Sequence, residues 1–228
     1  MGRAVPGPVA RAAVEYPGSD GKPMAESDAQ RVTMMYAMSA LEIWYADRED
    51  VYVSGDLLIY YQDGNPQASI APDVFVVHGV ANRMRTRYLV WEEGKAPDFV
   101  LEVASPSTWR EDEGSKRRVY ERLGVREYAQ HDPTGEHLGT RLKGARLSGG
   151  RYREQAVTRS VSGELTLSSE VLGLDVVVTG DGEFRFRDPV TGEYLRSPRE
   201  EHNRAEREAA ARRAAEERIA ELLRERGD

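Results

Sequence analysis

The most informative pattern in the chain is a pair of short apolar runs that lack the alternation of a half-exposed strand. Residues 99–103 read FVLEV and residues 70–77 read IAPDVFVV. Runs of this kind are typical of strands that are covered on both faces, as in a sheet flanked by helices. Each run carries one carboxylate, Glu102 in the first and Asp73 in the second. The two segments therefore predict neighbouring strands inside an α/β fold.

Helical patterns lie at both ends of the region that contains these strands. Ser27 or Asp28 can cap a helix that ends before Val51. The apolar positions of this helix recur at helical spacing and are Met34, Met38, Leu41 and Tyr45. From Pro198 onward the chain is rich in Glu, Arg and Ala with nearly balanced charge. This composition predicts one long C-terminal helix.

The segment after the FVLEV run predicts a crossover connection. Residues 111–123 have a helical pattern that stops at Gly124, a suitable left-handed C-terminal cap. Residues 127–131 then form another short strand, which ends at Asp132 and a proline. The order strand, helix, strand indicates a crossover unit between neighbouring strands.

Short β segments with Gly-containing turns are predicted for residues 135–196. They lie at residues 140–147, 151–158 and 182–188. We expect this region to be a β extension that shields the sheet. Its expected core anchors are Val171, Leu172 and Leu174. Upstream, residues 51–61 predict a strand or the arm of a hairpin, and residues 88–91 a further strand.

The chain is expected to have three parts. Residues 1–26, rich in Pro and Gly, predict a flexible tail, residues 27–196 one α/β domain, and residues 197–228 a charged helix. Heptad phasing of that helix places Glu208 and Arg212 in its two seam rows. A solvent-exposed helix is therefore favoured over a coiled-coil dimer, with a partner-binding helix as the third alternative. Whether the protein forms a homodimer stays open.

The amino-acid composition and charge limit the kinds of site and partner that the protein can have. The chain has no cysteine, which excludes disulfides and thiolate metal sites. No apolar run approaches membrane-spanning length and the start lacks a secretory signal, so we expect a cytoplasmic protein without a membrane partner. The net charge of -7 argues against indiscriminate coating of DNA but is compatible with a local basic cleft. The basic residues that could line one are Arg83, Arg85, Arg87, Arg110, Lys116, Arg117 and Arg118, although solvated surface charge is the simpler interpretation.

Carboxylates and one lysine form the candidate site. Glu102 lies within an apolar strand, where a carboxylate must be paired, protonated or bound to a metal. Asp73 follows Pro72, and for it alone a strand-start cap is the simpler interpretation. Asp112 and Lys116 are four residues apart on a predicted helix, so they share a face and could form only an ion pair. Together, however, two carboxylates can hold a hard divalent cation beside an ammonium that positions a water.

Several of these segments together resemble a known family. Over about residues 51–196 the chain is similar to the Uma-two family of endonuclease-like proteins, in the PD-(D/E)XK restriction-endonuclease-like superfamily. The similar segments are APDVFVV, WEEGKAPDFVLEVASPST, GVREY with DP, SEVLGLDV and the spacing of Asp112 and Lys116. One departure is that the superfamily signature has a lysine two residues after the second acid, where this chain has Ala104. The resemblance moves the role of that lysine to Lys116.

This resemblance implies a mixed central sheet flanked by helices and a Mg2+-dependent endodeoxyribonuclease that hydrolyses phosphodiester bonds. Asp73, Glu102 and the backbone carbonyl of Val103 would hold Mg2+ or Mn2+, and Lys116 would orient or help deprotonate the attacking water. The implied partner is nucleic acid, with DNA expected. The alternative is a catalytically silent module of the same fold that binds nucleic acid or a protein, and a hydrolase for a small phosphoester is a third reading.

Four further polar residues bear on the site. Some superfamily members contribute an acid from the first helix, where Glu42 lies, but a surface position is expected for it here. His78 and His131 each lie at a strand end and are expected to be structural. Gln130 interrupts the apolar character of its strand and is a candidate for the cleft.

Overall fold

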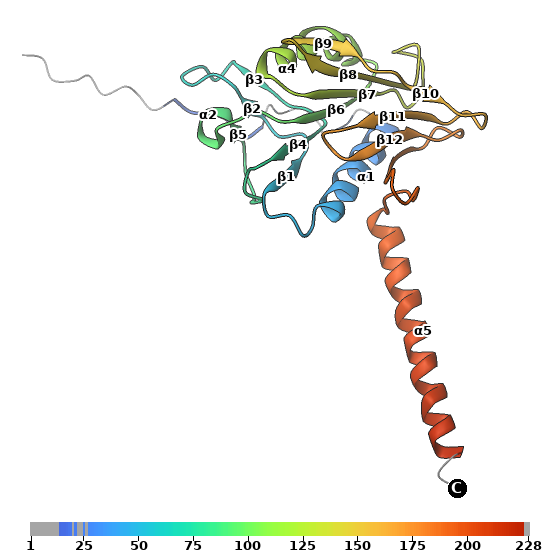
Figure 1. The fold of residues 1–228 in the computed structure, drawn as a ribbon. Helices are drawn as coiled ribbons and strands as arrows, with labels where there is room; N and C mark the ends of the chain where they lie inside the picture. Colours follow the sequence, from blue (N-terminus) through green and yellow to red (C-terminus); the bar gives the residue numbers. More distant parts are fainter. Residues whose placement is uncertain (1–13, 20, 22–24, 26, 226–228) are drawn as a thin grey trace, which may run out of the picture.

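Three layers make up the body of the protein. The computed structural model describes residues 14–19, 21, 25 and 27–225, with side chains up to residue 219. A central six-stranded sheet is covered on one face by helix α1 (Asp28–Trp44) and a four-stranded sheet, and on the other by helix α4 (Arg117–Leu123) and a three-stranded sheet (Figure 1). The protein is therefore a mixed α/β fold, as predicted.

The central sheet has the strand order β1-β4-β6-β7-β8-β9. Its strands are β1 Val51–Ser54, β4 Val74–His78, β6 Phe99–Val103, β7 Glu127–His131, β8 Leu142–Ser148 and β9 Arg151–Glu154. Strand β4 is antiparallel to β6, with Val74 opposite Leu101, so the two predicted central strands are confirmed as neighbours. Strand β6 is parallel to β7, with Glu102 opposite Gln130, which confirms the predicted crossover unit. The start of β4 and the ends of β6 and β7 consequently lie at one edge of the sheet.

The face that α1 covers holds the larger core. Ser27 caps α1, because its hydroxyl accepts a hydrogen bond of 3.1 Å from the Gln30 N–H. The four-stranded sheet next to α1 contains β10 Thr158–Arg159, β11 Leu165–Ser169, β12 Leu174–Val178 and β13 Phe184–Arg187. Val171, Leu172 and Leu174 are buried in this core, as predicted. Sequence patterns missed β11 and β12 as strands, but the expectation that a β extension shields the sheet is confirmed.

The opposite face contains the helical segment that carries the candidate lysine. It begins with α3 (Trp109–Glu111), continues through one π-helical turn, η1 (Asp112–Lys116), and ends with α4 at Gly124, whose φ of 80° gives the predicted left-handed cap. π-helical turns are rare, and they occur often at functional sites.

Two predicted strands of this region differ in the structure. The smaller sheet here contains β2 Ile59–Tyr60, β3 Ser69–Ile70 and β5 Tyr88–Leu89. The predicted strand at residues 51–61 is wrong in extent, because Asp56 has a φ of 48° and the left-handed residue divides the segment between two sheets. The predicted strand at residues 88–91 stops at Leu89, because Val90–Glu93 turn into helix α2, which Gly94 closes.

The two ends of the chain behave differently from each other. The predicted tail lies largely outside the described residues, but its described part packs on the body: the Tyr16 ring lies 5.0 Å from that of Tyr60 and 5.3 Å from that of Trp91. Helix α5 (Pro198–Glu225) is the predicted long C-terminal helix, and its side chains from residue 202 to residue 219 are exposed. Figure 1 shows α5 leading away from the sheets. Among the described residues, no helix has both the length and the apolar character that crossing a bilayer requires.

Gly55 packs closely against the backbone at the start of β4, and its substitution tests how this strand is positioned. A Cβ atom on Gly55 would lie 2.1 Å from the carbonyl oxygen of Asp73 and 2.7 Å from the sulfur of Met38. We expect Gly55→Ala to lower the free energy of unfolding by about 1–3 kcal/mol, because the backbone of Asp73 must shift. Urea unfolding measures the change. Gly114→Ala is the control, since a Cβ there meets only Arg118 at 3.9 Å, and equal effects of the two substitutions would contradict the expectation.

Candidate functional site

Glu102 is the centre of a polar cluster at the edge of the sheet where β6 ends. Its side chain is fully buried. The hydroxyl of Tyr120 donates a hydrogen bond of 2.5 Å to Oε1. Oε2 accepts hydrogen bonds of 2.9 Å from Nζ of Lys116 and 3.3 Å from the backbone N–H of Asp73. Three segments far apart in the sequence therefore meet on one carboxylate.

Asp73 points toward the end of the same strand. Its Oδ2 accepts a hydrogen bond of 2.6 Å from the backbone N–H of Val103. Gln30 of α1 also forms a hydrogen bond with the Asp73 side chain, and its Nε2 donates to the carbonyl oxygen of Val103 at 3.2 Å. One amide group thus binds both an Asp73 oxygen and the Val103 oxygen, so these two acceptors face a common position.

The π-helical turn places Lys116 and Asp112 over the cluster. Nζ of Lys116 lies 3.0 Å from Oδ1 of Asp112, so the predicted pairing of these two residues is confirmed. The lysine side chain is 18% exposed, whereas that of Asp112 is 1% exposed, and Asp73 is also partly exposed. Among the described residues, no donor meets good hydrogen-bond geometry at either oxygen of Asp112, although Lys116 and Thr108 lie close enough to lower its pKa. The backbone of this turn is held by Tyr128, whose hydroxyl donates to the carbonyl of Asp112 at 2.9 Å.

Burial shifts the protonation of all three acids in the same direction. Burial raises the pKa of Asp73 to about 6 and that of Glu102 to about 7, against the lowering effect of the Lys116 ammonium. Burial and the Glu102 carboxylate raise the pKa of Asp112 to about 7. Burial disfavours the charged form of Lys116, but Glu102 and Asp112 outweigh it and raise the lysine pKa above its usual value. The lysine is consequently an ammonium at neutral pH, in a cluster where negative charge is in excess.

The structure brings together every side chain predicted for the site, and it adds two that the sequence patterns did not assign. Tyr120 and Gln30 both contact the predicted acids. The sequence spacing already places Tyr120 on the helix face of Asp112 and Lys116, four residues after the lysine, but assigned it no role. Gln30 offered no comparable signal, because it reaches the site from the opposite face of the sheet around the ends of the strands.

The other polar candidates lie outside this cluster or beside it. Glu42 is exposed on α1, as expected. His78 and His131 contact backbone carbonyls, of Val171 at 3.1 Å and of Arg141 at 2.9 Å, in keeping with structural roles. Gln130 is buried beside Glu102 in the sheet, and no hydrogen-bond partner of its Nε2 occurs in the part of the chain that the structure describes.

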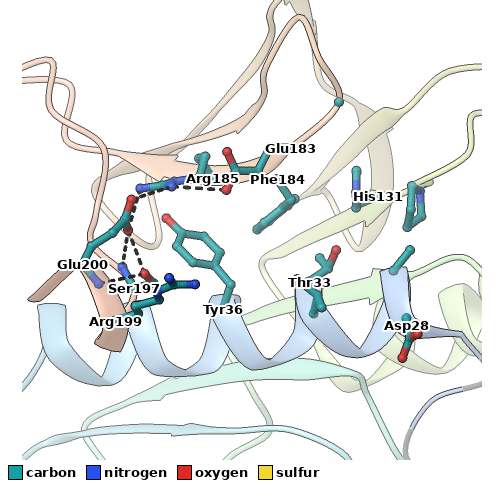
Figure 2. A pocket seen from close by; sticks show the side chains of 14 residues that line it. Asp28, Thr33, Tyr36, His131, Glu183, Phe184, Arg185, Ser197, Arg199 and Glu200 are labelled. Carbon is teal, nitrogen blue, oxygen red and sulfur yellow. Dashed lines mark hydrogen bonds and ion pairs between the residues drawn. The ribbon is translucent and has the colours of Figure 1, made fainter. Parts of the chain in front are cut away.

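A cavity of about 640 Å³ lies near the same edge of the sheet but does not contain the acids. Figure 2 shows it between α1 and the β13 segment, with Tyr36, Phe184 and His131 around it. Its charged side chains largely neutralise one another, since Arg185 pairs with Glu200 at 3.1 Å. The cluster around Glu102, where three acids meet one ammonium, is therefore the stronger candidate for chemistry.

The raised pKa of Glu102 predicts how stability depends on pH. The folded protein retains a proton that the unfolded chain releases above pH 4.5, so the stabilisation from this group is lost as the pH rises through about 7. We expect Glu102→Gln to raise the free energy of unfolding in the absence of divalent cations by about 1–3 kcal/mol at pH 8, with a smaller change at pH 5. Urea unfolding at the two pH values measures it. A variant that is less stable at pH 8 would mean that the carboxylate is needed as a structural partner of Lys116.

Comparisons with known proteins agree with the resemblance of the sequence. The profile of the Uma2 family, described as "Putative restriction endonuclease", matches residues 14–178. Solved structures also match, among them that of a "putative nuclease" from Anabaena variabilis ATCC 29413, with 15% identity, a TM-score of 0.44, and coverage of 62% of this chain and 76% of that chain. No curated protein matches the chain. Because the family profile spans well over half of the 228 residues, this chain belongs to the Uma2 family.

Proposed function

We propose that this protein is a divalent-metal-dependent endonuclease that hydrolyses phosphodiester bonds of nucleic acid, with DNA as the expected substrate. One observation carries the proposal: in a chain of the Uma2 family, Glu102, Asp73 and Asp112 surround the single ammonium of Lys116 at one edge of the sheet. Clefts at the carboxyl ends of parallel strands are common ligand sites in α/β folds. The carboxylates and lysine are the groups that metal-assisted phosphodiester hydrolysis requires.

The donor set fits a hard divalent cation. Three ionised acids and one ammonium leave two uncompensated negative charges in a site where burial already raises the pKa values of the acids. An Asp73 oxygen and the Val103 carbonyl already share one donor, the amide of Gln30, so both could face one cation. Within the described residues, no three acids or histidines are grouped as a ready-made metal cage. This is compatible with Mg2+, which is commonly bound by one or two carboxylates, waters and substrate phosphate.

We assign Asp73, Glu102 and the Val103 carbonyl as the metal ligands. Mg2+ or Mn2+ bound there would polarise the scissile phosphate and lower the pKa of a coordinated water. Tyr120 would orient the Glu102 carboxylate through its hydrogen bond to Oε1, leaving Oε2 toward Lys116 and Asp73. Gln30 would release the Asp73 and Val103 oxygens when the cation takes its place.

Lys116 acts in this proposal as a positive charge and not as a base. The neighbouring carboxylates raise its pKa, so it keeps its proton at neutral pH and cannot deprotonate a water. Its ammonium would orient the attacking water and stabilise negative charge that develops on the phosphate. The ion pair with Asp112 fixes the ammonium in this place. The sequence-based expectation that Lys116 helps to deprotonate water is therefore replaced by an electrostatic role.

Substitution of Lys116 tests this assignment. We expect Lys116→Met to lose about 10²- to 10³-fold in the cleavage rate, because methionine keeps much of the apolar stem but removes the charge. Cleavage of labelled single-stranded, duplex and branched DNA with Mg2+, Mn2+ or EDTA measures the rate. Lys95→Met is the matched control, since Lys95 pairs with Asp98 away from the site and cleavage should be unchanged. Full activity of Lys116→Met would end the assignment.

Measurements of metal binding distinguish the proposed metal ligands from Lys116. We expect isothermal titration calorimetry to show that Lys116→Met still binds Mn2+, whereas Asp73→Asn loses both Mn2+ binding and cleavage, because it removes a charged ligand oxygen. If the wild type binds Mn2+ and nucleic acid but cleaves no substrate, the alternative of a catalytically silent module would replace the proposal. Unchanged Mn2+ binding by Asp73→Asn would instead remove Asp73 from the metal site.

A further inference from the structure

An aromatic and basic cluster lies beside the proposed catalytic site and has no part in the proposed hydrolysis. The Trp109 ring stacks on that of His137, with ring centroids 6.2 Å apart and planes inclined by 17°. The guanidinium carbon of Arg110 lies 4.4 Å from the centroid of the Trp109 ring. Trp109 and His137 are half-buried and Arg110 is exposed. The cluster therefore presents a planar cation and aromatic surface to solvent.

The position of this cluster follows from the topology of the sheet. Trp109 opens α3, which connects the end of β6 to the turn that carries Asp112 and Lys116. His137 lies in the loop after β7, the parallel neighbour of β6. Loops after adjacent parallel strands meet at the same edge of a sheet, which here is also the edge of Glu102 and Val103. The stacked pair thus joins the two loops that border the proposed site.

The loop that carries His137 is firmly held. Both carboxylate oxygens of the buried Asp132 accept hydrogen bonds from backbone N–H groups of this loop, at distances of 2.7–3.1 Å. Burial opposes ionisation of Asp132, but the hydrogen bonds from Leu138 and His137 outweigh it and hold its pKa below the usual value. The aromatic surface is consequently fixed before any ligand arrives.

No acid among the described residues pairs with Arg110. Within the part of the chain that the structure describes, Arg110 contacts the Trp109 ring and forms no ion pair. Two other basic side chains near this segment are paired, Arg117 with Glu154 at 2.6 Å and Lys143 with Glu113. Arg118 and Arg122 of α4 also lack an ion pair among the described residues, but they do not stack on the aromatic pair. In a chain with a net charge of -7, an unpaired arginine next to the proposed site is a specific place for a phosphate.

We infer that Trp109, Arg110 and His137 bind an unpaired nucleotide of the substrate next to the bond that is cleaved, an inference that rests on the proposed function. Arg110 binds the phosphate, and the aromatic pair provides a stacking surface for the base. Stacking on aromatic side chains requires an accessible base face, which single-stranded nucleic acid offers and a regular duplex does not. The structure thus favours substrates with single-stranded character, and these three side chains bind substrate without taking part in the chemistry.

Binding of an oligothymidylate probe tests this inference without hydrolysis. Fluorescence anisotropy of the labelled probe is measured in Ca2+ at several salt concentrations, and gel electrophoresis checks that the probe stays intact. We expect Trp109→Ala to weaken binding by about 5- to 150-fold, because one stacked base is lost. We expect Arg110→Gln to weaken binding and to reduce the slope of log K against log salt by about 0.7, because one phosphate contact is lost.

Matched variants and a duplex probe make the test specific. Trp44→Ala removes an exposed tryptophan at the far end of α1, and Arg122→Gln removes an exposed arginine of α4, so neither should change binding. Trp109→Phe keeps an aromatic ring and should retain most of the affinity even if Trp109→Ala is poorly folded, which circular dichroism reports. Binding of a blunt duplex should be weaker than that of the single strand and insensitive to Trp109→Ala.

The outcomes distinguish this inference from the proposed function. If the wild type cleaves nucleic acid but Trp109→Ala, folded as judged by circular dichroism, and Arg110→Gln both bind the single strand like wild type and with its salt slope, the inference is overturned and the function stands. If Trp109→Ala does not fold, wild-type binding and salt slope of Arg110→Gln overturn it. If the wild type binds the single strand through these residues but cleaves nothing with Mg2+ or Mn2+, the inference stands and the endonuclease proposal fails. Absence of any binding to nucleic acid overturns both.

Discussion

A carboxylate inside a sheet has no water to solvate it, so the protein itself must provide every compensating donor. Around Glu102 these donors come from the lysine and tyrosine of one helical segment and from the backbone at the start of β4. Removing any one of them would leave a buried charge partly unpaired, which costs more than an exposed ion pair contributes. The order of the strands and the return of the helix over β6 are what allow these segments to meet.

Local irregularities of the backbone serve the same cluster. The π-helical turn of residues 112–116 lies in the segment that carries both the acid and the ammonium of the Asp112–Lys116 pair. At the start of β4, Gly55 lets two backbone segments approach more closely than a Cβ would permit. Departures from regular structure of this kind are costly unless the surroundings hold them in place. Both irregularities lie at the edge of the sheet that holds the Glu102 cluster, and not beside the cavity next to α1.

Much of the fold could be predicted from the sequence because burial on both faces leaves a clear pattern. The unbroken apolar runs of β4 and β6 indicated central strands, and Gly124 marked the end of the helix. The ends of strands could not be predicted where the conformation of a single residue decides them. The left-handed conformation of Asp56 divides residues 51–61 between two sheets, and the apolar pattern of this segment does not indicate it. In the site, Glu102 could be recognised from the sequence because a charged residue interrupts an apolar strand, and Asp112 and Lys116 because of their spacing on a helix. Gln30 could not be recognised in this way, because a glutamine in the first turn of a helix is common and has no distinctive pattern. Only the tertiary structure brings its amide to the carbonyl of Val103.

The position of Lys116 shows that the same pair of functional groups can arise from different sequence spacings. In a regular strand, residues two apart point to the same face, so a lysine at position 104 would approach the Glu102 carboxylate along the strand. This chain has Ala104 there, and Lys116 reaches the same carboxylate from the helix, at 2.9 Å. The two arrangements place an ammonium beside the same acid, but they are not equivalent. The helical lysine also pairs with Asp112, whose carboxylate helps to raise its pKa and fixes its side chain. A lysine held in this way keeps its proton at neutral pH, so its ammonium is suited to stabilise negative charge beside Glu102.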